Sequence, residues 1–304
     1  MSPDTNPIVT VLGGTGFLGR RAVERLAAAG WRVRVACRHP GGAEAGEGRV
    51  PVETDIRDAR SVAAALEGAR CAVNAVSLYV ERGDTTFDAI HVEAAGRVAA
   101  AAREAGVSRL VHLSGIGADP SARSAYIRAR GEGEGAVRSA FPGATIFRPS
   151  VMTGPDDAFL TTLAGIVRRL PVIPLFGRGE TRLQPVFVGD VAEAAARALA
   201  RAEDPPPLLE LGGPEAVRYG DLLRRIAREE GRRRLFLPVP FALWEALAAA
   251  VSVLPEPPVT RAQIALMRLD NVADPAQPGL ADLGVSPTPL ARVLADVLDR
   301  PARG

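Results

Sequence analysis

The feature that most constrains the fold is a glycine-rich turn near the N-terminus, Gly13-Gly14-Thr15-Gly16-Phe17-Leu18-Gly19. It fits G-x-x-G-x-x-G and, from Gly14, also G-x-G-x-x-G. The turn follows the apolar run 8–12 and opens an amphipathic helical pattern. In that context such glycines let a backbone approach a pyrophosphate, which the helix N-terminus binds. The pattern predicts a dinucleotide site. The alternative is a close-packed turn without a ligand, which needs one glycine rather than four.

Apolar runs alternate with helical patterns through the first half of the chain. Six runs are typical of strands: 8–12, 33–37, 50–53, 71–75, 110–113 and 144–147. Strands separated by helices of this length pair in parallel through right-handed crossovers, which places helices on both sheet faces. The predicted fold class is therefore α/β, a Rossmann-type doubly wound parallel sheet. Two of its helices should end at Gly30 and Gly106.

The pattern changes after Phe147, where prolines separate shorter elements. Helical patterns return near 191–201, 219–230, 241–254 and 289–298, and Pro205-Pro206-Pro207 is typical of a rigid connector. We expect a dinucleotide-binding Rossmann region at 1–150. A smaller C-terminal cap or partner-docking region should occupy 151–304, interleaved with the first.

The basic residues of this chain are all of one type. Its 37 Lys and Arg residues are all Arg, which excludes a Schiff-base lysine, a Walker-type phosphate lysine and a lysine general base. The formal net charge is +2, with 35 acidic residues spread among the arginines. The sequence shows no concentration of basic residues of the kind that indicates nucleic-acid binding.

The cysteines and histidines do not suggest a disulfide framework or a metal site. Cys37 and Cys71 lie in separate strand-like runs, which favours a reducing compartment. The three histidines have no ligand-spaced partners, so we predict no metal. No targeting signal precedes Ile8, and the predicted location is cytoplasmic.

The most apolar segment, 235–254, is interrupted by Pro238, Pro240 and Glu245. About fourteen helix-compatible residues remain, fewer than the roughly twenty that a transmembrane span needs. The segment predicts a buried helix centred on Trp244, with a helix lying in an interface as the alternative. The preceding triplet Arg232-Arg233-Arg234 indicates a solvated helix end, or else a patch for an anionic partner.

Three positions at strand ends fit a dinucleotide. Arg38 follows the second strand, and no acidic residue occurs before Glu44. An Arg here accommodates a 2′-phosphate, whereas NAD selection uses a carboxylate, so NADP(H) is favoured over NAD(H) unless Arg38 is merely a solvated strand end. Asp55-Ile56 would accept from the adenine amino group beside an apolar contact. Ala75-Val76 would lie at the carboxyl edge of the sheet; either pair could instead form only a cap or turn, with Asp58 the better cap.

These residues resemble the short-chain dehydrogenase/reductase superfamily, in its extended and atypical, NAD-dependent epimerase/dehydratase-like branches. The glycine turn, Asp55, Ser114, Tyr126 and Arg130 follow that family's order and approximate spacing. The resemblance covers essentially the whole chain. Within the superfamily, the chain looks like the bacterial relatives of the NADPH-binding accessory subunit of respiratory complex I. The resemblance extends through Arg148-Pro149-Ser150, Gly154-Pro155, Phe176-Gly177, Gln184 to Val188, Asp190-Val191-Ala192 and Asp282 to Val285.

The resemblance implies three catalytic positions. Ser114 would orient a substrate oxygen, Tyr126 would exchange its proton, and a Lys four residues later would hold the nicotinamide ribose and lower the tyrosine pKa. That position holds Arg130, which can present positive charge on the same helix face but differs in shape and direction from Lys. Gly131, Gly133 and Gly135 follow. They should loosen this turn unless close packing requires small residues.

Two functions follow from the resemblance. The first is an NADP(H)-binding protein of the complex I accessory-subunit type, with a structural or regulatory cofactor. Its partner would be respiratory complex I or another membrane-associated assembly, at the inner face of the membrane. The second is an active NADP-dependent oxidoreductase or epimerase that transfers hydride to or from a carbonyl or alcohol, with Tyr126 as acid/base.

Overall fold

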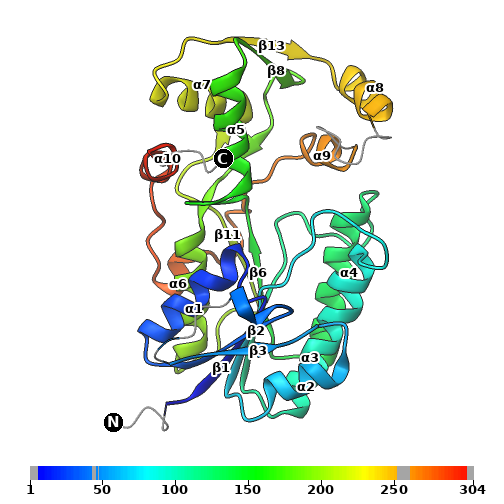
Figure 1. The fold of residues 1–304 in the computed structure, drawn as a ribbon, viewed down its shortest axis with the longest axis vertical. Coiled ribbons are helices and arrows are strands. Elements are labelled where there is room, and N and C mark those ends of the chain that lie inside the picture. Colours follow the sequence, from blue (N-terminus) through cyan, green and yellow to red (C-terminus); the bar gives the residue numbers. More distant parts are fainter. Residues whose placement is uncertain (1–5, 43–45, 47, 252–260, 300–304) are drawn as a thin grey trace. The chain divides into compact units, whose positions relative to one another are not determined.

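The chain forms two compact units, each built from several segments. The computed structural model describes residues 6–42, 46, 48–251 and 261–299 (Figure 1). The first unit holds the chain up to Pro149 together with Val188–Leu211 and Asp274–Ser286. The second holds Ser150–Phe187, Gly212–Ala273 and the chain from Pro287 onward.

The first unit is built on a seven-stranded sheet in the order β11-β6-β5-β4-β1-β2-β3. Every neighbouring pair is parallel, which confirms the Rossmann prediction. The chain order reverses between β1 and β4, and open α/β sheets bind ligands at such a switch point. The strands are β1 (Ile8–Leu12), β2 (Arg32–Cys37), β3 (Arg49–Glu53), β4 (Cys71–Asn74), β5 (Arg109–Leu113), β6 (Thr145–Pro149) and β11 (Leu208–Leu211).

Helices cover both faces of this sheet, as predicted. In Figure 1, α1 (Phe17–Ala28) and α6 (Val188–Ala200) lie on one face, and α2 (Ala59–Leu66), α3 (Ala95–Glu104) and α4 (Ala125–Ala140) lie on the other. The short segments are η2 (Pro40–Gly42), the π-helical η3 (Asp88–Ala94) and η4 (Leu280–Leu283). Gly30 and Gly106 follow α1 and α3 with φ of 84° and 71°, which confirms both predicted helix ends. Asp58 caps α2, as expected.

The glycines of α4 do not interrupt the helix, which runs unbroken from Ala125 to Ala140. Two of these glycines are required by close packing against neighbouring segments. A Cβ on Gly133 would lie 1.9 Å from the carbonyl oxygen of His91 in η3, and one on Gly131 would lie 2.3 Å from the Pro120 nitrogen. A Cβ on Gly135 would meet no atom within 4 Å. The small residues therefore let η3 and the 119–120 loop approach α4, where Tyr126 and Arg130 lie.

The second unit packs helices against one side of a small parallel sheet. That sheet is formed by β8 (Val172–Phe176) and β13 (Leu235–Val239). Buried residues of α5 (Ala158–Arg169), α7 (Tyr219–Glu229) and α10 (Leu290–Leu298) pack on Ile173 and Leu175. The remaining elements are β7 (Met152–Thr153), β9 (Arg182–Leu183), β10 (Val186–Phe187), β12 (Val217–Arg218), α8 (Phe241–Val251) and α9 (Arg261–Leu266).

The prediction of a buried helix around Trp244 is wrong. Ala248 is the buried residue of α8, whereas Leu243 and Leu247 are exposed. Ten of the eleven residues of this helix are apolar, but only part of its surface is covered. On the covered side, the Trp244 ring lies 4.4 Å from that of Phe176. No helix in the described part of the chain combines the length and apolar character needed to cross a membrane.

Candidate functional site

The glycine turn joins β1 to α1 with little room for side chains. A Cβ on Gly19 would lie 2.0 Å from the Gly13 carbonyl oxygen, and Gly13 has φ of +76°, which favours glycine. Thr15 and Gly16 are exposed, and Gly16 gives α1 no side-chain cap. No side chain at the cap therefore competes with an anion for the N–H groups there. The predicted residues all lie on this turn and the start of α1: Gly13, Gly14, Thr15, Gly16, Phe17, Leu18 and Gly19.

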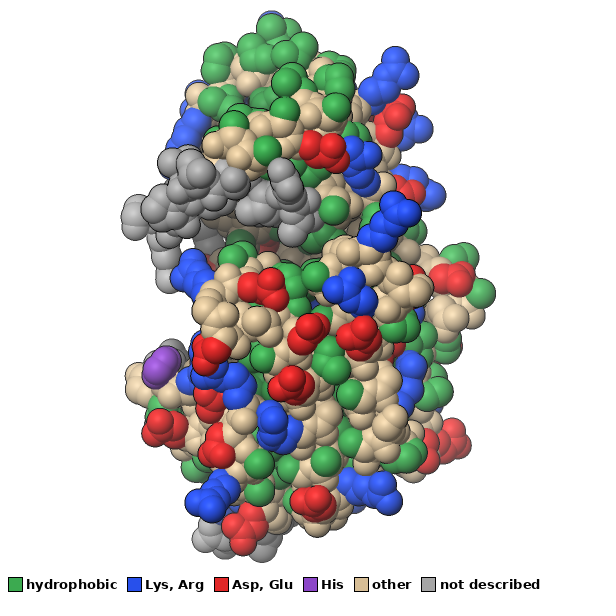
Figure 2. All heavy atoms as spheres, turned by 90° about the vertical axis from the view of Figure 1, so that its right-hand side faces the viewer, with side chains coloured by type: hydrophobic (Ala, Val, Ile, Leu, Met, Phe, Trp, Pro, Cys, Tyr) green, Lys and Arg blue, Asp and Glu red, His purple; other side chains and the backbone are tan. Residues whose placement is uncertain are grey.

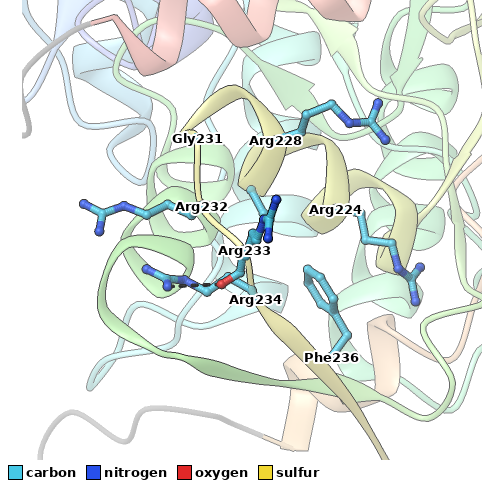
Figure 3. Close-up of a pocket in the computed structure, with 8 residues that line it drawn as sticks. Arg224, Arg228, Gly231, Arg232, Arg233, Arg234 and Phe236 are labelled. Atoms are coloured by element: carbon cyan, nitrogen blue, oxygen red, sulfur yellow. Dashed lines mark hydrogen bonds between the residues drawn. The ribbon is translucent and has the colours of Figure 1, made fainter.

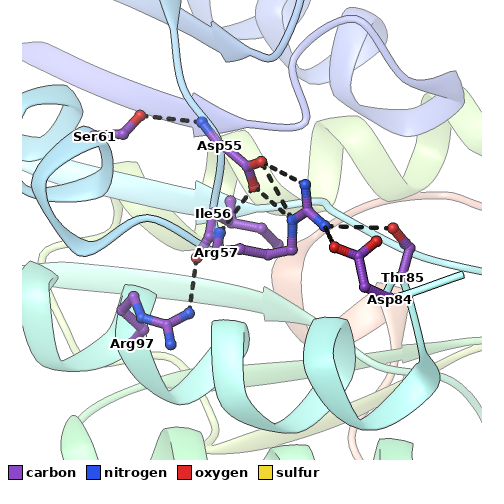
Figure 4. Close-up of polar contacts among 7 residues, drawn as sticks. All are labelled: Asp55, Ile56, Arg57, Ser61, Asp84, Thr85 and Arg97. Atoms are coloured by element: carbon purple, nitrogen blue, oxygen red, sulfur yellow. Dashed lines mark hydrogen bonds and ion pairs between the residues drawn. The ribbon is translucent and has the colours of Figure 1, made fainter.

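The Asp55 carboxylate is held by Arg57 (Figure 4). Its carboxylate accepts from Arg57, with Nη2 at 2.8 Å and Nε at 3.2 Å. The hydrogen bond from Arg57 lowers the pKa of Asp55 more than burial raises it, and the charge of the exposed Arg38 lowers it further. Ile56 is buried in the core, and its carbonyl accepts from Arg97. The ends of β2 and β3 therefore bring two guanidinium groups to one edge of the sheet.

Ala75-Val76 lies against the glycine turn. A Cβ on Gly13 would approach the Val76 side chain to 3.1 Å. Asn74 Oδ1 accepts from the Val76 N–H, so its amide nitrogen is the end that faces His112 Nδ1, at 3.2 Å. Because Nδ2 can only donate, His112 carries its proton on Nε2.

Arg130 is a buried cation whose hydrogen-bond partners are uncharged. Its side chain donates to the Leu113 carbonyl at 2.9 Å, to Ser77 Oγ at 2.6 Å and to the Tyr126 hydroxyl at 3.2 Å. Its buried Nε has no hydrogen-bond partner among the described residues. A buried charge is costly unless it is compensated. This position therefore suits a ligand rich in oxygen lone pairs.

Tyr126 meets the predicted partner Arg130 in an aromatic cluster. Its ring lies 5.9 Å from that of Tyr79, 5.4 Å from that of Phe87 and 5.8 Å from that of His91. Burial raises the pKa of the Tyr126 phenol more than the charge of Arg130 lowers it. The phenol is consequently neutral at pH 7 and a weak proton acceptor.

Ser114 points at a carboxylate. Its hydroxyl donates to Glu134 Oε1 at 2.6 Å, and both residues are buried. Arg148 holds both oxygens of Glu134, each at 2.8 Å, and also lies 3.5 Å from Glu210. A serine hydroxyl has one proton. While Ser114 gives that proton to Glu134, it can accept from a substrate hydroxyl but cannot donate to a carbonyl.

Two buried histidines flank Arg130. Burial, and then the charge of Arg130, lower the pKa of His91 and of His112 to about 3. His91 Nε2 lies 2.9 Å from the Leu78 carbonyl oxygen. Both rings are neutral at physiological pH. In the described part of the chain, no three His, Cys, Asp or Glu side chains are grouped to hold a metal ion.

Sequence reasoning assigned no role to Glu134, Arg148 or His91. Glu134 follows Arg130 by four residues, the spacing that places two side chains on one helix face, and this was a usable signal. Its partner Arg148 lies on β6, and helical periodicity does not reveal a pair formed between a helix and a strand.

Comparisons with known proteins identify the family of this chain. Residues 9–212 match the model of the NAD dependent epimerase/dehydratase family. The chain belongs to this family. It is 30% identical to NADH dehydrogenase (ubiquinone) 1 alpha subcomplex subunit 9, mitochondrial, of Rattus norvegicus over 96% of this chain and 80% of that protein. It is 32% identical to ceramide reductase of Caulobacter vibrioides over 79% of this chain and 76% of that protein.

A solved structure supports the fold of this epimerase/dehydratase family member. It is NADPH-dependent quinone oxidoreductase of Escherichia coli, complexed with NADPH. The two align with a TM-score of 0.75 at 20% identity, over 94% of this chain and 98% of that one. At this identity the likeness concerns the fold alone.

Proposed function

We propose that this protein binds NADP(H) as a structural or regulatory cofactor, in the manner of a complex I accessory subunit. The observation that carries the proposal is the hydrogen bond from Ser114 to Glu134. In this hydrogen bond Ser114 gives Glu134 the hydroxyl proton that would otherwise polarise a substrate carbonyl. The raised pKa of Tyr126 and the arginine in the lysine position point the same way.

The residues present fit a dinucleotide. The N–H groups that begin α1 would bind the pyrophosphate, and Arg38 the 2′-phosphate. Arg130 would donate from its unpartnered Nε toward ribose oxygens, which would compensate the buried charge. When bound, a nicotinamide supplies hydride chemistry. A structural role requires none of it, because binding to the folded state alone is stabilising.

The sequence identity of 30% to a mitochondrial complex I subunit, over most of both chains, supports respiratory complex I as the partner. The protein would then be cytoplasmic and peripheral at the inner face of the membrane. We expect the chain to copurify with respiratory complex I from native membranes. Its absence from both the purified complex and the assembly intermediates would contradict this part of the proposal.

Ligand-induced stabilisation tests the cofactor. At a hundredfold excess over Kd, a ligand adds about 2.7 kcal/mol to stability, which for a chain of 304 residues corresponds to a rise in Tm of about 4 °C. We expect NADPH to raise Tm more than NADH does. In Arg38→Ala the NADPH shift should fall to the NADH level, because the 2′-phosphate loses its partner. Equal shifts with both cofactors that Arg38→Ala leaves unchanged would remove the NADP(H) assignment.

An active oxidoreductase or epimerase is the second candidate. The contact of 3.2 Å between Arg130 Nη2 and the Tyr126 hydroxyl favours it, as does the identity to a ceramide reductase. Tyr126→Phe separates the two functions in the same samples. The structural proposal predicts the same NADPH shift in the variant and no carbonyl-dependent NADPH oxidation in either protein. Such an oxidation in the unmodified protein that disappears in Tyr126→Phe would establish the enzyme.

A further inference from the structure

One face of the sheet formed by β8 and β13 is apolar and uncovered. Leu235 pairs in register with Val172, and Leu237 pairs with Pro174. Leu235 is 71% exposed, Leu237 54% and Val172 42%. The alternate residues Ile173 and Leu175 point into the core and are buried. Parallel sheets normally have both faces covered, and apolar patches exposed on a protein surface often mark interaction sites, so this uncovered apolar face is unusual.

The helix that follows β13 extends this apolar surface. α8 begins directly after Pro240, and Trp244 Nε1 donates to the carbonyl of Leu175 in β8 at 3.0 Å. Leu243 and Leu247 on this helix are exposed. The one charged residue of α8, Glu245, lies 2.7 Å from Arg268. Figure 2 shows hydrophobic side chains gathered over this part of the second unit.

Arginines gather immediately before β13. The segment from Arg224 to Arg234 contains six arginines and two glutamates, and Arg168 holds one of these, Glu230, at 2.6 Å. An open depression of about 440 Å³ lies among them (Figure 3), lined by Arg224, Ala227, Arg228, Gly231, Arg232, Arg233, Arg234 and Phe236.

The arginines of this cluster differ in what they contact. Arg234 anchors the turn, because its side chain donates to the backbone carbonyls of Val167 at 2.7 Å and Arg168 at 3.2 Å. Arg228, Arg232 and Arg233 are exposed. No carboxylate in the described ranges pairs with these three. The backbone turn is thus fixed while three guanidinium groups remain available to an outside anion.

We propose that this surface docks the protein on a membrane that contains anionic phospholipids. We use the name basic-apolar surface for the exposed residues of β8, β13, α8 and the turn before β13, namely Arg228, Arg232, Arg233, Val172, Leu235, Leu237, Leu243 and Leu247. Exposed leucines beside unpaired cations match the two layers of a lipid interface, in which acyl chains lie beneath headgroup phosphates. Charge complementarity selects an anionic lipid surface. The proposal goes beyond the cofactor role and does not depend on it.

Vesicle cosedimentation with the full chain tests the proposal. We expect binding to vesicles of phosphatidylcholine mixed with phosphatidylglycerol at low salt, little binding to phosphatidylcholine alone, and loss of binding at high salt. Arg232→Gln/Arg233→Gln should lower the partition coefficient roughly 20- to 30-fold, since each basic residue contributes about fivefold. Leu235→Ser/Leu237→Ser should also reduce binding to the anionic vesicles.

The control is Arg103→Gln/Arg123→Gln, which removes the same charge from exposed positions of the first unit. It should bind the vesicles as the unmodified protein does. Equal binding to both vesicle types, or equal losses in the two double-arginine variants, would overturn the proposal. A chain that ignores vesicles but forms a dimer that Leu235→Ser/Leu237→Ser dissociates would assign the face to a second copy instead.

Discussion

Glu134→Gln is expected to lower the free energy of unfolding by about 3 kcal/mol, because breaking a buried ion pair leaves the other charge uncompensated. Arg148 donates to both oxygens of Glu134, which is almost completely buried. The amide keeps the shape but removes the negative charge. Because Glu210 remains 3.5 Å from Arg148 and still compensates part of its charge, the expected loss of unfolding free energy lies at the lower end of the usual range for buried ion pairs. Urea unfolding of the two proteins at pH 7 measures the difference.

Two further variants separate the ion pair from a general effect on α4. Glu132→Gln changes an exposed residue of the same helix that lies 3.9 Å from Arg128, and it should cost less than 1 kcal/mol. Glu134→Leu/Arg148→Met/Glu210→Gln removes the three buried charges together and should be more stable than Glu134→Gln. If Glu132→Gln and Glu134→Gln cost the same, the buried network does not stabilise the unit as described.

Local patterns predicted most of the first unit. Strand-like runs, glycine helix ends and the Asp58 cap are each encoded within a few residues. The alternation of strands and helices along the chain then predicted parallel pairing of the strands. β11 was missed because it is four residues long and follows three prolines that indicate a connector. It becomes a strand by pairing with β6, and a sequence window does not contain that partner.

The site was predicted in part. Spacing on a helix placed Tyr126 beside Arg130, and the structure has them in contact. The orientation of Ser114 depends on Glu134, which lies 20 residues away. The requirement for glycine at position 133 could not be predicted from local sequence either. The carbonyl of His91, which excludes a side chain there, belongs to a π-helical segment distant in the sequence. Residue type gave the candidates, and tertiary contacts decided what each one can do.

Acidification from pH 6.5 to pH 4.5 is expected to lower the free energy of unfolding by about 4 kcal/mol through His91 and His112. Both have a folded pKa of about 3, lowered chiefly by burial and then by the charge of Arg130, against about 6.5 in the unfolded chain. The unfolded state therefore binds more protons in this window. The stabilisation is complete above pH 6.5 and is lost as the pH falls toward 3. Urea unfolding at half-unit pH intervals measures the slope.

The third histidine provides the control for this slope. His39 is exposed, so His39→Gln should leave the pH dependence unchanged. His112→Asn retains an acceptor for Asn74 and should roughly halve the slope between pH 6.5 and 4.5, whatever its own cost at pH 7. Because the lowered pKa of Asp55 affects stability only below about pH 4, the window isolates the histidines. A slope that His112→Asn does not change would mean that this ring is already protonated in the folded protein, contrary to its burial beside Arg130.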